Sequence, residues 1–268
     1  MTEIFDNIRE IYDFSLPCEP LRPFIEFFSE SSRDRTARLA AGNPFTVEMF
    51  PSWTPTFWIN LGVPYQLTTG QVHYKISTHD DILVLRDTPT ARYNHSADHL
   101  FTVKFFPGGL ESILGVSQTN FIGKVVPLRH ILPARLLDDL KCASCTSQRI
   151  ALLEDFFLAS LPRQLDKDHY TKLVRDSIGL YENTAMLPNT GQLAERLFIH
   201  SKAINRYFHR VVGLPPKRYF SIVRTRMALT SYFADPTNFS AADFGYYDQS
   251  HFYKAVRQFT GRRITDRL

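Results

Sequence analysis

The first half of the chain alternates between short apolar runs and turn-forming residues. Between residues 45 and 106 the runs are rich in β-branched and aromatic side chains, and Pro, Gly, Asn and Asp separate them. Short runs bounded in this way are typical of strands. The pattern predicts strands at residues 47–50, 57–61, 71–76, 82–85 and 101–106. Because no helical pattern interrupts them, it favours a β-sandwich or barrel.

The spacing of the apolar residues becomes helical after these strands. Large aliphatic and aromatic side chains recur every three or four residues over 136–140 and 150–161, so two helices are expected there. Pro162 would end the second helix, since proline cannot continue one. From about residue 166 onward the pattern is helical throughout. We therefore predict the α+β class, with a β-rich N-terminal domain over residues 1–165 and an all-α C-terminal domain over residues 166–268.

The composition is that of an ordinary globular protein. Of the 268 residues, 44% are hydrophobic and 22% are charged, which excludes a disordered chain. No run of 18 apolar residues is available to cross a membrane, and residues 1–6 lack the order of a signal peptide. Three cysteines are too few for a disulfide framework. These observations predict a cytoplasmic protein with no membrane partner.

The net charge of +4 is unevenly distributed along the chain. Residues 166–268 contain 16 Lys or Arg against 9 Asp or Glu, a net charge of +7. The preceding 165 residues contain 15 against 18, a net charge of −3. A basic C-terminal part favours contact with a polyanion there and not in the N-terminal part, although a basic face can also be simply solvated.

A predicted helix over residues 202–211 has one packing face and one polar face. At about 100° per residue, the packing face carries Ile204, Tyr207, Phe208 and Val211. The opposite face carries Lys202, Asn205, Arg206 and His209. A short helix precedes it, and Asn189 with Gln192 has the spacing of a capping box at its start. Arg pairs with guanine and Asn with adenine in the major groove, so the two helices match a helix-turn-helix. Taken alone, however, the segment favours an ordinary amphipathic helix with a hydrated polar face.

The pattern recurs about 48 residues later, which favours the helix-turn-helix interpretation. Gly213 and Gly261 are 48 residues apart, as are Arg206 and Lys254. The second polar face carries Gln249, Ser250, Tyr253, Lys254 and Arg257. Gly245 lies where the turn needs a residue that tolerates positive φ. Between the two units, Pro215 and Pro216 start a further helix that would connect them.

These residues resemble the DNA-binding domain of AraC/XylS-type transcription regulators over about the last 100 residues. The resemblance is carried by four stretches: Gly245-Tyr246-Tyr247-Asp248-Gln249-Ser250-His251-Phe252, Asn205-Arg206-Tyr207-Phe208, Gly213-Leu214-Pro215-Pro216-Lys217, and Arg224 followed by Ala228. It implies two helix-turn-helix units that insert recognition helices into successive major grooves. His200, Ser240, Lys254, Val256 and Ile264 depart from the family pattern, and Lys254 lacks the bidentate geometry of arginine.

The resemblance implies DNA contacts of two kinds. Base and backbone contacts are expected from Lys202, Asn205, Arg206 and His209 in the first groove and from Gln249, Ser250, Tyr253 and Lys254 in the second. Phosphate contacts, which position the protein without identifying bases, are expected from Arg210, Lys217, Arg218 and Arg257. The expected partners are double-stranded DNA, a small-molecule effector, a second copy in a homodimer and, for an activator, RNA polymerase.

The N-terminal part resembles an uncharacterised module that precedes such domains in bacterial regulators. Three stretches carry this resemblance: Phe14-Ser15-Leu16-Pro17 with Leu21–Ile25, Phe57–Gly62, and Phe105–Gly109. The module implies a cupin-like β-sandwich or barrel that senses a small molecule or mediates dimerisation. The aromatic residues Trp53, Phe57, Trp58 and Tyr65 would then line a ligand cavity or form sheet core.

Other motifs favour neither an enzyme nor a metal protein. His95 and His99 have the His-x3-His spacing of a zinc pair, but a cupin metal site needs His-x-His followed by Glu, so surface histidines are expected. Cys142 and Cys145 form a lone CxxC motif between two helices. Gly108 and Gly109 are expected in a turn, not a phosphate loop. We predict no catalysis, no cofactor and no metal; the alternatives are a β-domain enzyme or metal cupin, and a second unit that has lost DNA recognition.

Overall fold

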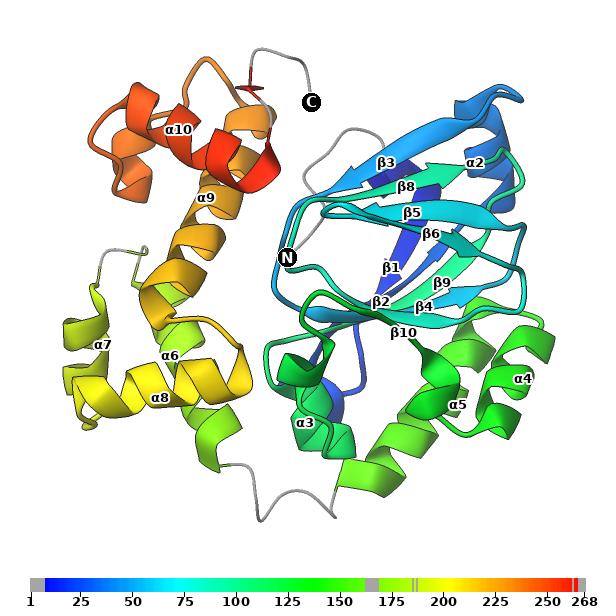
Figure 1. The fold of residues 1–268 in the computed structure, drawn as a ribbon, viewed down its shortest axis with the longest axis horizontal. Coiled ribbons are helices and arrows are strands. Elements are labelled where there is room, and N and C mark those ends of the chain that lie inside the picture. Colours follow the sequence, from blue (N-terminus) through cyan, green and yellow to red (C-terminus); the bar gives the residue numbers. More distant parts are fainter. Residues whose placement is uncertain (1–7, 162–168, 185, 187, 262, 265–268) are drawn as a thin grey trace.

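The computed structural model describes residues 8–161, 169–184, 186, 188–261 and 263–264. We call residues 8–161 the N-terminal region and residues 169–264 the C-terminal region. The first combines two sheets with helices, and the second contains helices only in its described residues (Figure 1). The α+β class and the order of the two parts are confirmed. The boundary expected near residue 165, and Pro162, lie outside the described residues, so the division into two domains stays a prediction.

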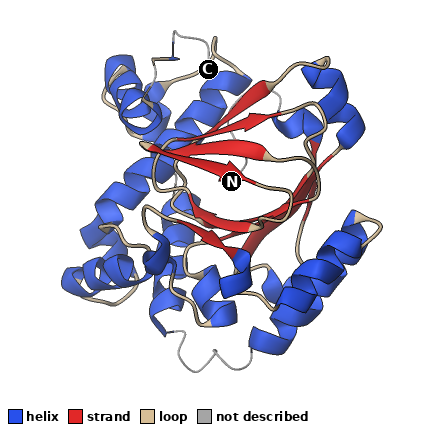
Figure 2. Cartoon of the chain, turned by 45° about the vertical axis from the view of Figure 1, so that its right-hand side comes forward, coloured by secondary structure: helices blue, strands red, loops and turns tan. Residues whose placement is uncertain are grey.

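The N-terminal region is built on two antiparallel sheets. The six-stranded sheet has the order β1 (Tyr12–Ser15), β2 (Ile25–Ser31), β9 (Leu100–Phe105), β4 (Pro55–Asn60), β7 (Ile82–Leu85) and β10 (Val125–Pro127). The four-stranded sheet has the order β3 (Phe45–Met49), β8 (Thr90–Asn94), β5 (Tyr65–Thr69) and β6 (Val72–Ile76). Figure 2 shows the sheets facing each other in red, with helices around them. The prediction of a sandwich or barrel is confirmed.

The central strands are buried on both faces, which explains their nearly continuous apolar sequence. Successive side chains of a strand point to opposite faces. In β4, Phe57 and Ile59 pack under the helices, whereas Trp58 lies between the sheets. In β9, Phe101 and Val103 likewise join the core under the helices. The six-stranded sheet therefore separates two apolar layers.

The helices of the N-terminal region are α1 (Ile8–Ile11), η1 (Glu19–Leu21), α2 (Arg33–Ala40), α3 (Gly109–Leu114), η2 (Gln118–Phe121), η3 (Leu128–His130), α4 (Ala134–Cys142) and α5 (Thr146–Ser160). Among them, α3, α4 and α5 pack on one face of the six-stranded sheet (Figure 1). The two helices predicted after the sheet are α4 and α5. Leu110, Leu140 and Phe157 from α3, α4 and α5 belong to one core with the sheet.

Several elements differ from the sequence expectations. Five strands were not predicted: β1, β2, β5, β8 and β10. Strands β5 and β8 alternate buried and more exposed positions over only five residues each, which is too short to be recognised; β8, for example, reads Thr-Ala-Arg-Tyr-Asn. The interpretation of Gly108 and Gly109 as a turn alone was wrong, because Gly108 caps α3 with φ +77° and the helix begins at Gly109. A Cβ atom on Gly109 would lie 2.1 Å from the Phe24 carbonyl oxygen, so this close approach requires glycine.

The C-terminal region is a set of helices around one core. They are α6 (His169–Asn183), α7 (Thr190–Arg196), α8 (Ser201–Val211), α9 (Pro216–Ala234), η6 (Ala241–Phe244) and α10 (Gln249–Thr260). Phe50 and Trp53 of the N-terminal region join this core, and Phe50 contacts Phe259 at a ring separation of 6.2 Å. The two regions therefore share a packed interface.

Candidate nucleic-acid interface

The first unit consists of α7 and α8, and its start is set by the expected capping box. The Asn189 side-chain oxygen accepts bonds from the backbone N–H groups of Gly191 and Gln192, at 2.9 and 3.0 Å. The Gln192 side chain in turn accepts a bond from the Asn189 backbone N–H at 2.9 Å. These bonds satisfy donors that a helix start leaves without partners. The sequence prediction is confirmed at this position.

Helix α8 has the two faces that its sequence predicts. Ile204, Phe208 and Val211 are buried in the core of the C-terminal region. The four polar residues of the opposite face are all exposed: Lys202, Asn205, Arg206 and His209. Tyr207 is half-buried at the edge between the faces, and the Arg206 guanidinium lies 5.2 Å from its ring. The polar face is therefore presented to solvent by a rigidly packed helix.

The second unit consists of η6 and α10, joined by a turn at Gly245. Gly245 has φ +69°, as its position predicts, and it ends the short 3-10 helix η6. Asp248 then caps α10 by accepting a bond from the His251 backbone N–H at 2.7 Å. Phe252, Val256 and Phe259 are buried. The residues predicted for DNA contact are exposed, and they are Gln249, Ser250, Tyr253, Lys254 and Arg257.

Helix α9 separates the two units and packs against both (Figure 1). Its 19 residues correspond to about 28 Å at 1.5 Å per residue. Successive major grooves on one side of B-DNA are about 34 Å apart. On the side of the second unit, the Arg224 guanidinium lies 4.7 Å from the Tyr246 ring, and Thr225 and Tyr246 share a hydrogen bond of 2.8 Å. Buried contacts thus fix the second unit to the connecting helix.

The residues predicted to contact phosphate differ in their surroundings. Lys217 and Arg218 are exposed in the first turn of α9, and Lys217 lines a surface cleft together with Ser221 and Arg224. Arg210 is different, because its guanidinium pairs with Glu111 of the N-terminal region at 2.8 Å. This ion pair gave no signal in the sequence, from which Arg210 was expected to contact DNA.

The end of α8 contacts the N-terminal region closely. The Gln118 side-chain amide donates bonds to the carbonyl oxygens of Trp53 and Val212, both at 3.2 Å. Gly213 has φ +89°, and a Cβ atom there would lie 2.6 Å from the Ile122 side chain. The first unit is therefore docked on the N-terminal region through its C-terminal end, which leaves its polar face exposed.

Two exposed aromatic residues in the turns were not singled out from the sequence. Phe198, between α7 and α8, has 96% of its surface exposed and φ +55°. Tyr247, just before α10, is 92% exposed. The only signal in the sequence for these exposed residues was a large apolar side chain in a turn, where polar residues are usual.

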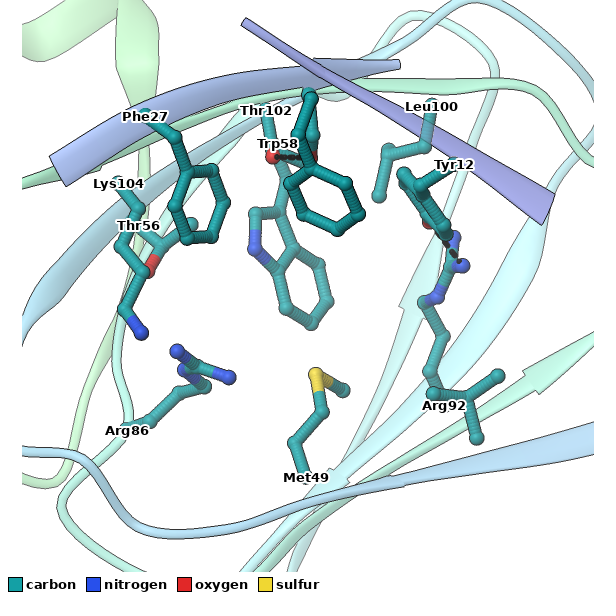
Figure 3. A pocket seen from close by; sticks show the side chains of 13 residues that line it. Tyr12, Phe27, Met49, Thr56, Trp58, Arg86, Arg92, Leu100, Thr102 and Lys104 are labelled. Carbon is teal, nitrogen blue, oxygen red and sulfur yellow. Dashed lines mark hydrogen bonds between the residues drawn. The ribbon is translucent and has the colours of Figure 1, made fainter. Parts of the chain in front are cut away.

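The other residues considered in the N-terminal region have structural surroundings. His99 is half-buried and contacts Glu30 at 2.8 Å, whereas His95 is exposed in a turn, so describing both as surface histidines was wrong for His99. Cys142 and Cys145 are free and exposed. No group of three or more metal-ligating side chains was found within the described residues. The sequence left open whether four aromatic residues line a cavity or form sheet core. Of these, Trp58 lines the cavity between the sheets (Figure 3), while Phe57 belongs to the core under the helices.

The geometry defines a pair of helix-turn-helix units, and comparison with known proteins agrees. Residues 193–266 match the family described as a helix-turn-helix domain. The predicted AraC/XylS-type DNA-binding domain is thereby confirmed for this part of the chain. No curated protein sequence gives a significant match.

Solved structures give distant matches that span both regions. A structure of ToxT from Vibrio cholerae has a TM-score of 0.48 and 12% identity, covering 84% of this chain and 96% of that one. Another ToxT structure, from Vibrio cholerae strain SCE256 and bound to an unsaturated fatty acid, has a TM-score of 0.44 and 10% identity, covering 83% and 93%. The AraC-like transcriptional activator CuxR has a TM-score of 0.26 and 13% identity, covering 84% and 88%.

Within the described part of the chain, no helix combines the length and the apolar composition that crossing a bilayer requires.

Proposed function

We propose that the protein is a sequence-specific transcription regulator of the AraC type, and not an enzyme. The observation that carries this proposal is the pair of packed helices, α8 and α10, that expose polar faces at the two ends of α9. A recognition helix must combine a buried face with an exposed face of hydrogen-bonding groups. The proposal includes action in the cytoplasm, where bacterial DNA lies, and contact with RNA polymerase in the case of an activator.

Each unit has a proposed set of DNA contacts. In the first groove these are Lys202, Asn205, Arg206 and His209, and in the second Gln249, Ser250, Tyr253 and Lys254. Lys217, Arg218 and Arg257 are proposed to contact phosphates, because they are exposed cations outside the centres of the polar faces. Arg210 would contact phosphate only after exchanging its Glu111 partner for DNA.

The N-terminal region is proposed to sense a small molecule or to mediate homodimerisation. A cavity between its two sheets supports sensing. The Trp53 backbone N–H donates to the carbonyl oxygen of Arg86, which lines this cavity, at 3.0 Å. Gln118 bonds in turn to Trp53 and to Val212 at the end of α8, which supplies a physical connection between the cavity and α8.

Selection of binding sites from a random DNA pool, followed by footprinting, tests the proposal. The full chain is expected to protect two successive major grooves per protomer. Protection of a single groove would show that the second unit has lost DNA recognition, and no enrichment of any sequence would refute the proposed function.

The Arg206→Ala variant tests base recognition in the first groove. Loss of a bidentate base contact costs about 1–3 kcal/mol, so affinity for the selected site should fall about fivefold to 150-fold and the preference at one base pair should relax. Arg135→Ala, in which a 94%-exposed arginine side chain of α4 is removed, is the control and should bind normally. Equal losses on selected and random DNA would show that Arg206 contacts only phosphate.

The Lys217→Ala variant tests phosphate contact. Affinity should fall on all sequences, and the slope of log affinity against log salt concentration should decrease by about one unit. An unchanged slope contradicts this assignment.

A further inference from the structure

Two aromatic side chains are far more exposed than any other large apolar residue that the structure describes. They are Phe198, which is 96% exposed, and Tyr247, which is 92% exposed, whereas the next, Leu16, is 73% exposed. Phe198 precedes α8 and Tyr247 precedes α10, the two helices proposed to enter major grooves. The two most exposed rings therefore lie in the turns of the two helix-turn-helix units.

The two rings do not occupy equivalent positions in their units. Ala194 and Ala241, each buried in the first helix of its unit, are 47 residues apart. With this shift Phe198 corresponds to Gly245, and both have positive φ, +55° and +69°. Tyr247 lies two residues further along, directly before the N-cap of α10. Of the two rings, that of Tyr247 is thus the nearer to the start of its helix.

The backbone of Tyr247 is held on both sides. On one side, Gly245 forms the turn, and the Tyr246 hydroxyl shares a hydrogen bond of 2.8 Å with Thr225 of α9. On the other side, Asp248 caps α10. The Tyr247 side chain therefore extends from a fixed point at the start of this helix.

The fold does not use the Tyr247 ring for packing. An apolar residue directly before an N-cap often packs against the fourth residue of the helix, which in α10 is Phe252. Here the neighbouring Tyr246 makes that contact, with its ring 5.5 Å from the Phe252 ring and only 3% of its surface exposed. Removing the Tyr247 ring should therefore leave the stability of the fold unchanged.

The surroundings of Tyr247 favour DNA over a protein partner. The exposed residues that follow it, Asp248, Gln249 and Ser250, are all polar. Docking sites for proteins are typically contiguous apolar patches, which this surface is not. One apolar ring beside hydrogen-bonding side chains instead matches the major-groove edge of an A·T pair, where the thymine methyl group lies next to hydrogen-bonding atoms. Recognition helices contact base edges with their N-terminal residues.

The distribution of charge favours a base contact over a phosphate contact. Residues 241–250 contain two carboxylates, Asp243 and Asp248, and no lysine or arginine. These carboxylates repel phosphate groups. The cations of α10, Lys254 and Arg257, lie one and two turns further along the helix. The start of α10 therefore suits the bases, and its later turns suit the backbone of the DNA.

We propose that Tyr247 contributes to specificity in the second groove by packing its ring against the C5-methyl group of a thymine. The assignment rests on the DNA-binding function proposed above and adds a base-reading residue to it. The contact removes both the ring and the methyl group from water and does not need the tyrosine hydroxyl. Gln249 and Ser250 would form hydrogen bonds with neighbouring base edges.

Replacement of thymine by deoxyuridine in the selected site tests the assignment, because it removes only the methyl group. Each thymine in the protected grooves is replaced in turn, and binding of the full chain is measured by gel shift. One of these replacements should weaken binding about fourfold, the effect of exposing one methyl-sized group.

Three variants identify the side chain responsible. Tyr247→Ala should bind the unmodified site about tenfold more weakly, and it should no longer distinguish thymine from deoxyuridine at that position. Tyr247→Phe keeps the ring and should behave like the unmodified protein. Phe198→Ala is the matched control, because it removes an equally exposed ring from the first unit and should retain the dependence on the methyl group in full. All three should unfold at the same urea concentration as the unmodified protein, since both rings are exposed.

Four outcomes overturn the assignment. The first is that no deoxyuridine replacement weakens binding, or that its effect persists in Tyr247→Ala. The second is an equal loss in Tyr247→Phe and Tyr247→Ala, which would show that the hydroxyl contacts a phosphate. The third is unchanged DNA binding in Tyr247→Ala, which would leave the ring to a protein partner. The fourth is a selected site without thymine in the protected grooves.

These results are distinct from a failure of the proposed function. If a site is selected and footprinted, each of the four outcomes refutes only the role of Tyr247 and leaves the regulator standing. If no sequence is enriched from the random pool, the regulator itself is refuted, and the role of Tyr247 is refuted with it.

Discussion

The buried amide of Gln118 is expected to be a major contributor to the interface between the two regions. The side chain is 1% exposed. Its nitrogen donates to the Trp53 and Val212 carbonyl oxygens at 3.2 Å each, and its oxygen accepts from the Gly108 backbone N–H at 3.1 Å. Gln118→Ala removes all three bonds at once. It leaves three buried backbone groups without partners and opens a space where the side chain lay.

The expected loss follows from the number of bonds. Each buried group left without a partner costs about 1–3 kcal/mol, so the free energy of unfolding should fall by at least about 3 kcal/mol. The measurement is urea denaturation followed by tryptophan fluorescence, with the dependence on urea concentration compared between variants. Gln148→Ala is the control, because this exposed glutamine bonds to Ser144 nearby and should change stability by no more than about 0.5 kcal/mol. A loss below about 1 kcal/mol in Gln118→Ala would refute the reasoning that these three buried bonds stabilise the fold.

Two further predictions concern charged groups. Glu111→Gln breaks the ion pair that occupies Arg210, so DNA affinity at low salt should rise severalfold in gel-shift titrations. An unchanged or lower affinity would show that Arg210 does not contact DNA. Burial raises the pKa of Glu30, but hydrogen bonds from His99 and the charge of Arg149 lower it more. The ionised Glu30 therefore stabilises the folded protein fully above the ordinary glutamate pKa, and this stabilisation is lost as the pH falls below it. Urea denaturation at pH 6 and pH 3.5 should therefore show a smaller acid-induced loss in Glu30→Gln than in the unmodified protein, and equal losses would contradict the assignment.

The second helix-turn-helix unit illustrates what can be predicted locally. Gly245 needs a positive φ, Asp248 caps the next helix, and Phe252 with Val256 forms its buried face, all within a dozen residues. Helical spacing and capping depend on side chains three or four positions apart. For this reason the faces of α8 and α10 agree with the sequence analysis in their buried and exposed residues.

The strands of the N-terminal region were predicted less completely. The missed strand β8 carries Arg92 at a buried position. In the sequence, a charged residue at that position argued against a core strand. Its burial is explained only by the pairing with Asp98 and Tyr12, a residue 80 positions away. Likewise, the ion pair between Glu111 and Arg210 gave no signal in either segment, because both residues also suit an exposed helix face.

The sequence by itself determined the class of the C-terminal region, its two helices with exposed polar faces and the uneven distribution of charge. The tertiary structure alone decided the cavity between the sheets, the buried cations that line it and the interface. In the cavity lining, Thr56 and Lys104 become neighbours only when β4 pairs with β9, and Arg86 meets Arg226 only when α9 packs on the N-terminal region. Local patterns reveal what short-range geometry dictates, whereas contacts between distant segments depend on the packing of the whole chain.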